Sequence, residues 1–342
     1  MEDNYAAFLV RPRRKPLDVD EADSRFPDED EFVIKNAAVS INPIDIFMQA
    51  ETVQNLTTPA ILGADVAGEV VDVGSQVNRF SVGDRVMGHA LRLATEDDRH
   101  AAFQNYTVLM PNMACPIPPS LSYEDASTMP LGISTAAAAL FQENSLALRP
   151  PVLYPSPQDE WVIVAGATGN VGSHGVRLAR AAGYKVLGTA STSNFDEAKK
   201  LGATELVNSR SSDLAGELVQ KLAGRRVAGA FDATGNEESN IGVAKALAEC
   251  VGNRVLTSVL DWWPGEGSEP GNGVTFKPIQ AIQIRSNNVG KMVWEDYLPD
   301  ALATNKYFIP FPKANVVGNG LGAIQGAMDN KVSKGKAVVT LK

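Results

Sequence analysis

The sequence predicts an α/β protein of two domains, in which a β-rich N-terminal part precedes a part where strands and helices alternate. The 342 residues are about twice the ~150 that one domain typically takes. Residues 31–41 and 67–73 are β-branched runs bounded by turn residues, as in strands. From Trp161 onward, short apolar runs alternate with helical stretches, an order typical of right-handed βαβ units and a parallel sheet.

The elements can be justified in chain order. The Pro-rich segment 111–119 predicts a connector. Helices are predicted over 123–128 and over 133–142, and the second stretch is rich in alanine. Trp161–Ala165 is an almost continuous apolar run, typical of a strand buried on both faces. The expected strands after it are 185–189, 205–207, 227–232 and 254–260, and the expected helices are 171–183, 196–201, 214–223 and 239–250. A Gly/Pro-rich loop over 262–273, helices over 292–304 and 321–329, and a strand over 336–341 follow.

Charge and cysteine content exclude several classes of protein. Lys and Arg total 31 against 40 Asp and Glu, so the net charge of −9 leaves no basic surplus for nucleic-acid phosphates. Cys115 and Cys250 are too few for a disulfide framework or a four-cysteine zinc site. No apolar stretch approaches the ~20 residues of a membrane span, and the acidic N-terminus is unlike a signal peptide. We therefore expect a cytoplasmic protein that binds neither nucleic acid nor membrane.

The sharpest motif is the glycine-rich segment 164–172, between an expected strand and an expected helix. Gly166, Gly169 and Gly172 form a variant of the dinucleotide-binding fingerprint. Glycine permits a tight turn and lets backbone N–H groups approach a pyrophosphate at the positive end of a helix. Gly172 would let the helix lie close to the sheet. The alternative is a plain βα turn whose glycines serve packing.

The segment after the second expected strand predicts which dinucleotide binds. An NAD site usually has an acid there for the ribose 2′-OH, whereas residues 188–194 read GTASTSN. The hydroxyl and amide groups of Ser191, Ser193 and Asn194 can donate to a 2′-phosphate, so we predict NADPH. The two serines could instead, or in addition, cap the helix that begins near Phe195.

Six motifs resemble segments of the medium-chain dehydrogenase/reductase superfamily, in its zinc-independent branch of quinone oxidoreductases and enoyl reductases. In chain order they are Asn42–Asp45 (NPID), Gly63–Val70 (GADVAGEV), Gly83–Val86 (GDRV), Pro130–Ala136 (PLGISTA), Lys199–Ala203 (KKLGA) and Gly335–Val339 (GKAVV). Together they span almost the whole chain. Residues 193–196 and the loop with Trp262 and Trp263 are most similar to fungal enoyl reductases that act in trans with polyketide synthases.

The resemblance implies both the fold and the site. It implies a GroES-like β-barrel domain of residues 1–125 with a C-terminal return over 295–342, a Rossmann doubly wound domain over 126–294, and an active site in the cleft. The cofactor-binding residues that it implies, together with those of the motifs above, are Ile44, Asp45, Ile46, Phe47, Thr135, Gly166, Ala167, Thr168, Gly169, Asn170, Val171, Ser191, Ser193, Asn194, Thr234, Val255, Leu256, Ser333 and Lys334. The implied substrate-contacting residues are Leu131, Ser134 and Thr135.

The chain departs from its zinc-dependent relatives at the metal ligands. Those relatives have a Cys in the region of Ile44 and Asp45, a Gly-His-Glu where this chain has Gly63–Asp65, and a four-cysteine lobe where it has residues 91–105. We therefore expect no metal, and without a Lewis acid C=C reduction is favoured over alcohol oxidation. Of the three histidines, His89 is the strongest candidate for a chemical role, ahead of His100 and His174.

The predicted function is NADPH-dependent reduction of the C=C bond of an α,β-unsaturated carbonyl or thioester, in trans with a polyketide synthase carrier, by a monomer or homodimer. Catalysis would come from positioning and from hydrogen bonds to the developing enolate oxygen. One alternative is an NADPH quinone oxidoreductase, in which the reduced alkene is part of a quinone ring. The other is a non-catalytic NADPH-binding protein, because Phe47 stands where relatives often have Lys.

The sequence identifies no proton donor. Asp45, beside a proline, is expected to cap backbone N–H groups, and Tyr106 is expected in the barrel core. Trp262 and Trp263 either cover an apolar substrate or form an oligomer contact.

Overall fold

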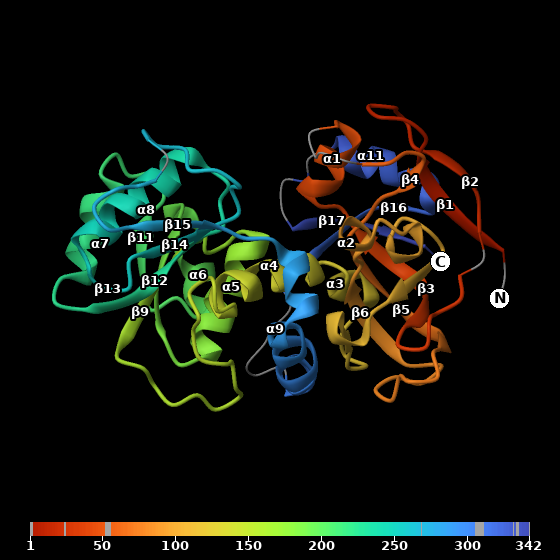
Figure 1. Ribbon diagram of the computed structural model, residues 1–342, viewed down its shortest axis with the longest axis horizontal. Coiled ribbons are helices and arrows are strands. Elements are labelled where there is room, and N and C mark those ends of the chain that lie inside the picture. Colours follow the sequence, from red (N-terminus) through yellow and green to blue (C-terminus); the bar gives the residue numbers. More distant parts are fainter. Residues whose placement is uncertain are drawn as a thin grey trace. The chain divides into compact units, whose positions relative to one another are not determined.

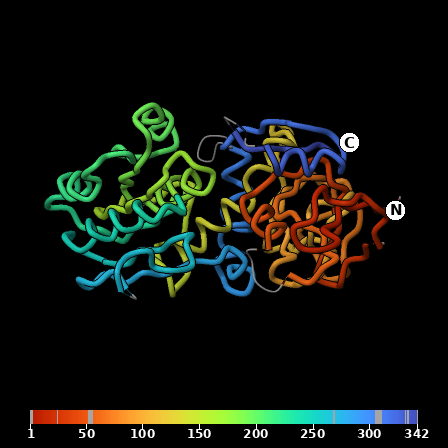
Figure 2. The backbone as a smooth tube through the Cα atoms, turned by 90° about the horizontal axis from the view of Figure 1, so that it is seen from above, coloured from red at the N-terminus to blue at the C-terminus, as the bar shows by residue number. Residues whose placement is uncertain are grey.

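The computed structural model describes residues 3–23, 25–51, 56–267, 269–304, 311–330, 332 and 335–341. The chain divides into two compact units (Figure 1). The first unit comprises residues 1–131 and 294–342, and the second comprises residues 132–293. Within the first unit, the C-terminal segment lies against the N-terminal one (Figure 2). The first unit is therefore assembled from two stretches of chain that are far apart in the sequence.

A mixed sheet forms the centre of the first unit. Its strand order is β16-β17-β3-β5-β6-β8, and β7 also pairs with β3. The strands are β3 (Phe32–Ser40), β5 (Asp65–Val73), β6 (Arg85–His89), β7 (Tyr106–Leu109), β8 (Ala114–Pro116), β16 (Ala314–Asn319) and β17 (Lys336–Thr340). A smaller antiparallel sheet has the order β2-β1-β4, from β1 (Asn4–Leu9), β2 (Asp18–Ala22) and β4 (Ala60–Ile61). The apolar core of the unit includes Phe32, which stacks on Phe80 with ring centroids 4.4 Å apart.

Two elements of the first unit differ from the sequence-based expectation. The Pro-rich segment 111–119 is not only a connector, because it contains the edge strand β8. An edge position tolerates Pro116, which has no N–H to donate to a neighbouring strand. A short helix, α1 (Pro43–Gln49), follows β3 and begins with proline at its first position.

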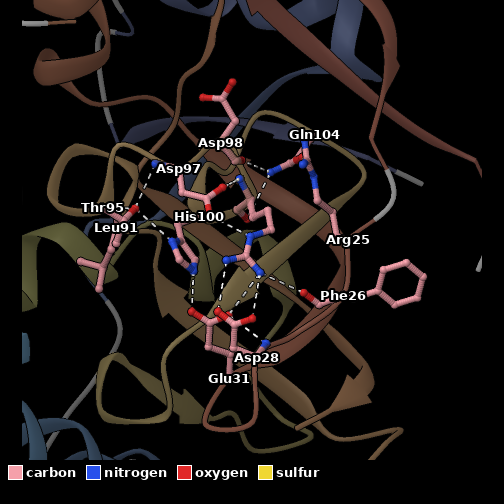
Figure 3. A network of polar contacts seen from close by, with 11 residues as sticks. Arg25, Phe26, Asp28, Glu31, Leu91, Thr95, Asp97, Asp98, His100 and Gln104 are labelled. Carbon is pink, nitrogen blue, oxygen red and sulfur yellow. Dashed lines mark hydrogen bonds and ion pairs between the residues drawn. The ribbon is translucent and has the colours of Figure 1, made fainter. Parts of the chain in front are cut away.

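The segment 91–105 is held in place by polar contacts (Figure 3). It contains the short helices α2 (Arg92–Thr95) and η1 (Asp98–His100). The Arg99 guanidinium lies 3.2 Å from an Asp28 carboxylate oxygen. Next to it, His100 Nε2 lies 2.8 Å from Glu31 Oε1, and both side chains are buried. These contacts join the segment to the chain that leads into β3.

The second unit is built on a parallel sheet. Its strand order is β11-β10-β9-β12-β14-β15, which corresponds to the order 3-2-1-4-5-6 of the dinucleotide-binding doubly wound fold. The strands are β9 (Glu160–Ala165), β10 (Lys185–Ala190), β11 (Glu205–Asn208), β12 (Arg226–Asp232), β13 (Val251–Gly252, paired with β12), β14 (Val255–Ser258) and β15 (Thr275–Pro278). The helices between them are α5 (Asn170–Ala181), α6 (Phe195–Leu201), α7 (Leu214–Leu222) and α8 (Glu237–Glu249). The predicted fold class is confirmed.

Helices cover both faces of this sheet. Each face presents side chains to them, because successive residues of a strand point to opposite faces. Ile163 of β9 shares an apolar cluster with Leu218 of α7 and Val243 of α8. The next residue, Val164, instead faces Gly175 of α5, since a Cβ on that glycine would lie 3.4 Å from Val164 Cγ1. Strand β9 is therefore buried on both sides, as its apolar run predicts.

The remaining helices belong to both units, and α4 contains the boundary between them. They are α3 (Tyr123–Ala126), α4 (Pro130–Phe141), the 3-10 helices η2 (Pro111–Met113), η3 (Thr192–Asn194), η4 (Ala281–Ser286) and η6 (Leu321–Ala323), α9 (Asn288–Gly290), the π-helix η5 (Lys291–Tyr297), α10 (Leu298–Thr304) and α11 (Ile324–Asp329). Throughout the described ranges, every helix is too short or too polar to cross a membrane.

Candidate functional site

The glycine turn, Gly166–Gly169, joins β9 to α5 in the second unit. Gly166 has φ +75°, a conformation that L side chains rarely adopt. Its N–H donates to Thr189 Oγ1 at 3.2 Å, and the N–H of Ala167 donates to the Thr189 carbonyl at 2.9 Å. The N–H of Gly169 donates to the Gly166 carbonyl at 2.8 Å. The turn is thus closed internally and attached to β10 through Thr189, a residue that the sequence motif does not include.

Gly172 allows helix α5 to approach the glycine turn. A Cβ at this position would lie 2.1 Å from the carbonyl oxygen of Gly166, which is far inside van der Waals contact. The helix therefore approaches the chain directly after β9, as expected for Gly172. Gly175 makes a second close approach, because its Cβ would lie 3.1 Å from the Phe231 ring on β12.

The N-terminus of α5 follows the turn directly and leaves backbone N–H groups without acceptors in the helix. The first residue to donate back into the helix is Ser173, whose N–H bonds to the Gly169 carbonyl at 2.9 Å. The N–H groups of Val171 and Gly172 precede that bond and have no acceptor within the helix. Gly169, the N-cap residue, has no side chain that could satisfy them. Such a helix end, with its partial positive charge, is suited to a phosphate.

A second loop lies beside the glycine turn, at the point where the strand order of the sheet reverses. In doubly wound sheets this switch point, between β9 and β12, is where ligands bind. Thr234 follows β12, and its Cγ2 is 2.9 Å from the position of a Cβ on Gly166. Asp232 holds this loop: its Oδ1 accepts from the N–H and the hydroxyl of Thr234 at 2.8 and 2.6 Å. Burial raises the pKa of Asp232, and the bonds from Ser239 and Thr234 oppose that rise.

Val255 and Leu256 lie at the start of β14, not at its carboxyl end. Leu256 is fully buried in the apolar cluster of the sheet. The carboxyl end is occupied by Ser258 and Val259, and the N–H of Val259 donates to the Asp232 carbonyl at 3.2 Å. Val259, directly after this strand, is therefore the residue that lies beside the loop after β12.

The loop after β10 presents hydroxyl and amide groups. Ser191 Oγ and Ser193 Oγ are 3.1 Å apart, and the Asn194 amide nitrogen lies 3.5 Å from Thr168 Oγ1 in the glycine turn. The N-cap residue of α6 is Asn194, and neither it nor Ser191 makes a side-chain capping bond. The interpretation of the serines as helix caps is therefore wrong.

In the first unit, α1 carries four of the expected cofactor-binding residues. Asp45 is buried, and its Oδ2 accepts from the N–H of Asn42 at 2.7 Å, which confirms the expected capping role. Burial raises the pKa of Asp45 to about 7. Ile44 packs against the apolar core, whereas Ile46 is partly exposed and Phe47 is 50% exposed.

Helix α4 carries the expected substrate-contacting residues. Leu131 is in its first turn and is partly buried, while Ser134 is fully buried and Thr135 is 8% exposed. Ser333 and Lys334, the remaining expected cofactor contacts, lie outside the described residues.

The residues near the zinc-ligand motifs of the relatives do not form a zinc site. Within the described ranges no group of three or more His, Cys, Asp or Glu side chains is placed to hold a metal. Asp65 forms a buried ion pair with Lys336, so an ammonium group already neutralises this carboxylate. The neighbouring His89 is buried, which lowers its pKa to about 4, and its Nδ1 has no hydrogen-bond partner. This donor set does not fit zinc, and no step of the reaction is assigned to it.

Other residues singled out by the sequence have structural positions. Tyr106 is buried in the first unit, as expected, and His174 is buried in α5. Trp263 packs on Phe276 of β15 with ring centroids 5.6 Å apart. Trp262 is more than half exposed.

Comparisons with known proteins agree with this fold. The sequence profile of the alcohol dehydrogenase GroES-like domain matches residues 28–119, and that of zinc-binding dehydrogenases matches residues 170–300. A zinc-binding alcohol dehydrogenase domain-containing protein, cipB of Emericella nidulans, is 41% identical over 99% of this chain and 98% of its own length. The trans-enoyl reductase himH of Aspergillus japonicus is 32% identical over 95% of this chain and 93% of its own. The solved structure of the CurK enoyl reductase matches with a TM-score of 0.74 at 22% identity, over 99% of both chains, and so supports the fold alone.

Proposed function

Because the chain belongs to the medium-chain dehydrogenase/reductase superfamily and is an oxidoreductase of that family, we propose that it uses NADPH to reduce the C=C bond of an α,β-unsaturated carbonyl or thioester. The observation that carries the proposal is the pairing of the glycine turn with a loop of hydroxyl and amide groups after β10. Relatives named trans-enoyl reductases support the reaction type. The partner that we propose is an acyl carrier of a polyketide synthase.

The second unit provides the proposed dinucleotide contacts. When bound, the nicotinamide cofactor supplies the hydride. We assign the pyrophosphate to the glycine turn and to the N–H groups at the start of α5. The N–H of Ala167 is not one of these contacts, because it donates to the Thr189 carbonyl. Ser191, Ser193 and Asn194 bind the 2′-phosphate, where an acid would repel it. Thr234 contacts the cofactor at the switch point, and Val259, beside the same loop, takes the place proposed for Val255 and Leu256.

Helix α4 provides the proposed contact to the reacting carbonyl. As the alkene is reduced, negative charge builds on the carbonyl oxygen, and a hydroxyl that donates to it lowers the barrier. Thr135 is assigned this bond because Ser134 has no exposed surface. Asp45 is not assigned as the proton donor, because its carboxyl group is fully buried. Ile46 and Phe47 of α1, which are both exposed, keep their assignment as cofactor contacts.

A second candidate is quinone reduction, since a quinone oxidoreductase of Pseudomonas syringae has the same fold with a TM-score of 0.73 at 22% identity, over 99% of this chain and all of its own. The two reactions share the cofactor and differ in the acceptor. They can be separated by supplying different acceptors to one preparation of the enzyme.

The test is NADPH oxidation, followed by absorbance, with a 2-enoyl thioester, a simple enone and a quinone as acceptors and NADH as the control. Turnover of the thioester with NADPH preferred supports the proposal, and Thr135→Val should lower it while Thr135→Ser retains it. Turnover of the quinone alone supports the second candidate. Tight NADPH binding without turnover on any acceptor, free or carrier-bound, would contradict both.

A further inference from the structure

We propose that Asp65, Lys336 and Ser40, here called the Asp65 cluster, position the start of helix α4 and with it the hydroxyl of Thr135. None of the three is assigned to contact substrate or cofactor, so they are positioning residues. The inference rests on the proposed function only where it concerns turnover, because the placement of α4 can be measured without any substrate.

The Asp65 cluster is a buried ionic group in the first unit. Asp65 is fully buried at the start of β5, and its Oδ2 forms an ion pair with the ammonium group of Lys336 on β17. The same oxygen accepts from Ser40 Oγ at 3.0 Å and from Asn42 Nδ2 at 2.9 Å. One carboxylate oxygen therefore receives three donors.

The other oxygen of Asp65 binds helix α4. Asp65 Oδ1 accepts from the N–H of Leu131 at 2.5 Å. Leu131 is the second residue of α4, and N–H groups in the first turn of a helix have no acceptor inside the helix. A carboxylate at this end is favourable because it faces the positive end of the helix dipole.

The other two members of the cluster bind the chain just before α4. Lys336 Nζ donates to the Thr128 carbonyl at 3.0 Å, and Ser40 Oγ donates to the Ser127 carbonyl at 2.8 Å. The backbone from residue 127 to residue 131 is thus bonded to the cluster at three points. Residue 131 is also the last residue before the chain enters the second unit.

Thr135 lies four residues after Leu131, which is about one helical turn. A displacement of the first turn is therefore passed directly to the Thr135 hydroxyl. This role requires two acceptor oxygens on residue 65, one for Leu131 and one for the three donors. Asparagine supplies one acceptor, so in Asp65→Asn an amide N–H would face a donor on one side or the other.

The test compares Asp65→Asn with Asp72→Asn, the same change on the same strand, where the partly buried carboxylate only accepts from the neighbouring Val73 N–H. We would measure hydrogen exchange of residues 127–135, kcat and KM for the enoyl thioester, and the Kd for NADPH. We expect Asp65→Asn to speed exchange in residues 127–135 and to lower kcat, each by about tenfold, with the NADPH Kd changed less than twofold. Asp72→Asn should change none of them.

Unchanged exchange and kcat in Asp65→Asn would overturn the inference. A uniform rise in exchange across the first unit would also overturn it, because that result indicates a general loss of stability. If Asp65→Asn does not fold, the same measurements are made on Ser40→Ala, which loses the bond to the Ser127 carbonyl. The same outcomes then support or overturn the inference. If the wild type reduces no acceptor, the proposed function fails, and the exchange measurement still decides the role of the cluster.

Discussion

The substitution Gly172→Ala tests whether the glycine turn is the dinucleotide site. The added Cβ would lie 2.1 Å from the Gly166 carbonyl oxygen and 2.7 Å from its carbonyl carbon. Cβ atoms essentially never lie within 3.0 Å of a heavy atom to which they are not linked through neighbouring bonds. The backbone at residue 172 must therefore move away from that of Gly166 by at least about 0.9 Å, the difference between 3.0 and 2.1 Å. Both partners are backbone atoms, and no side chain can rotate to relieve the overlap.

Forcing an extra carbon into a packed region costs about 1–3 kcal/mol. A movement of this size also displaces the N–H groups of Val171 and of residue 172 from the phosphate that we assign to them. If the free energy of NADPH binding becomes less favourable by the same amount, about 1–3 kcal/mol, the affinity for NADPH falls roughly 5- to 150-fold. We therefore expect the NADPH Kd of Gly172→Ala to rise at least about fivefold.

The assay is a titration of NADPH by fluorescence or calorimetry, together with the thermal unfolding midpoint. Gly326→Ala in α11 is the matched control, because a Cβ there meets no atom within 4 Å. It should bind NADPH like the wild type. A variant Gly172→Ala that unfolds earlier yet binds NADPH with unchanged Kd would refute the assignment of the turn to the phosphates. One that neither unfolds earlier nor binds more weakly would refute the steric reasoning itself.

Three further substitutions test the rest of the site. Ser191→Asp should raise the NADPH Kd about tenfold and leave NADH binding unchanged, because the new carboxylate repels only a 2′-phosphate; equal effects on both cofactors in paired titrations would contradict this. Thr189→Val should weaken NADPH binding a few-fold, because the Gly166 N–H loses its side-chain acceptor, and Thr189→Ser should restore it. Asp45 has a pKa raised from 3.8 to about 7, so its contribution to stability is present below about pH 4 and is lost as the pH rises through about 7. The free energy of unfolding of Asp45→Asn, measured with denaturant, should therefore rise by about 3 kcal/mol relative to that of the wild type between about pH 5 and pH 8, at ~1.36 kcal/mol per pKa unit. A difference between the two proteins that does not change with pH would argue against the raised pKa.

The sequence predicts the second unit well because its signals are local. The apolar run of β9, the glycine turn and the start of α5 occupy one short stretch, and each part is recognisable without knowing the rest of the chain. Strand β15 is not predictable in this way: Thr275–Pro278 is short, largely exposed and ends in proline, so only its pairing with β14 identifies it. The roles of Gly172 and Gly175 likewise depend on which atoms face each glycine.

The contacts of the first unit are mostly long-range, and the sequence does not reveal them. Asp65 belongs to a recognisable motif, but its partner Lys336 is 271 positions away, and the motif says nothing of the bond to Leu131. Glu31 and His100, which are 69 positions apart, form a buried pair that the strand signal of residues 31–41 does not reveal. Periodicity and propensity describe neighbours along the chain, whereas these side chains are paired by the tertiary fold.

The order in which the ribosome makes the chain has a consequence for the first unit. Strand β17 lies inside its sheet, between β16 and β3, yet residues 336–340 are synthesised after the whole second unit, 132–293. Until then residues 38–40 of β3 lack their partner strand on that edge, and Asp65 is a carboxylate without its ammonium partner. The second unit is one continuous stretch that can fold as soon as it is made. We therefore expect the nascent protein to complete its doubly wound unit first and its barrel unit last.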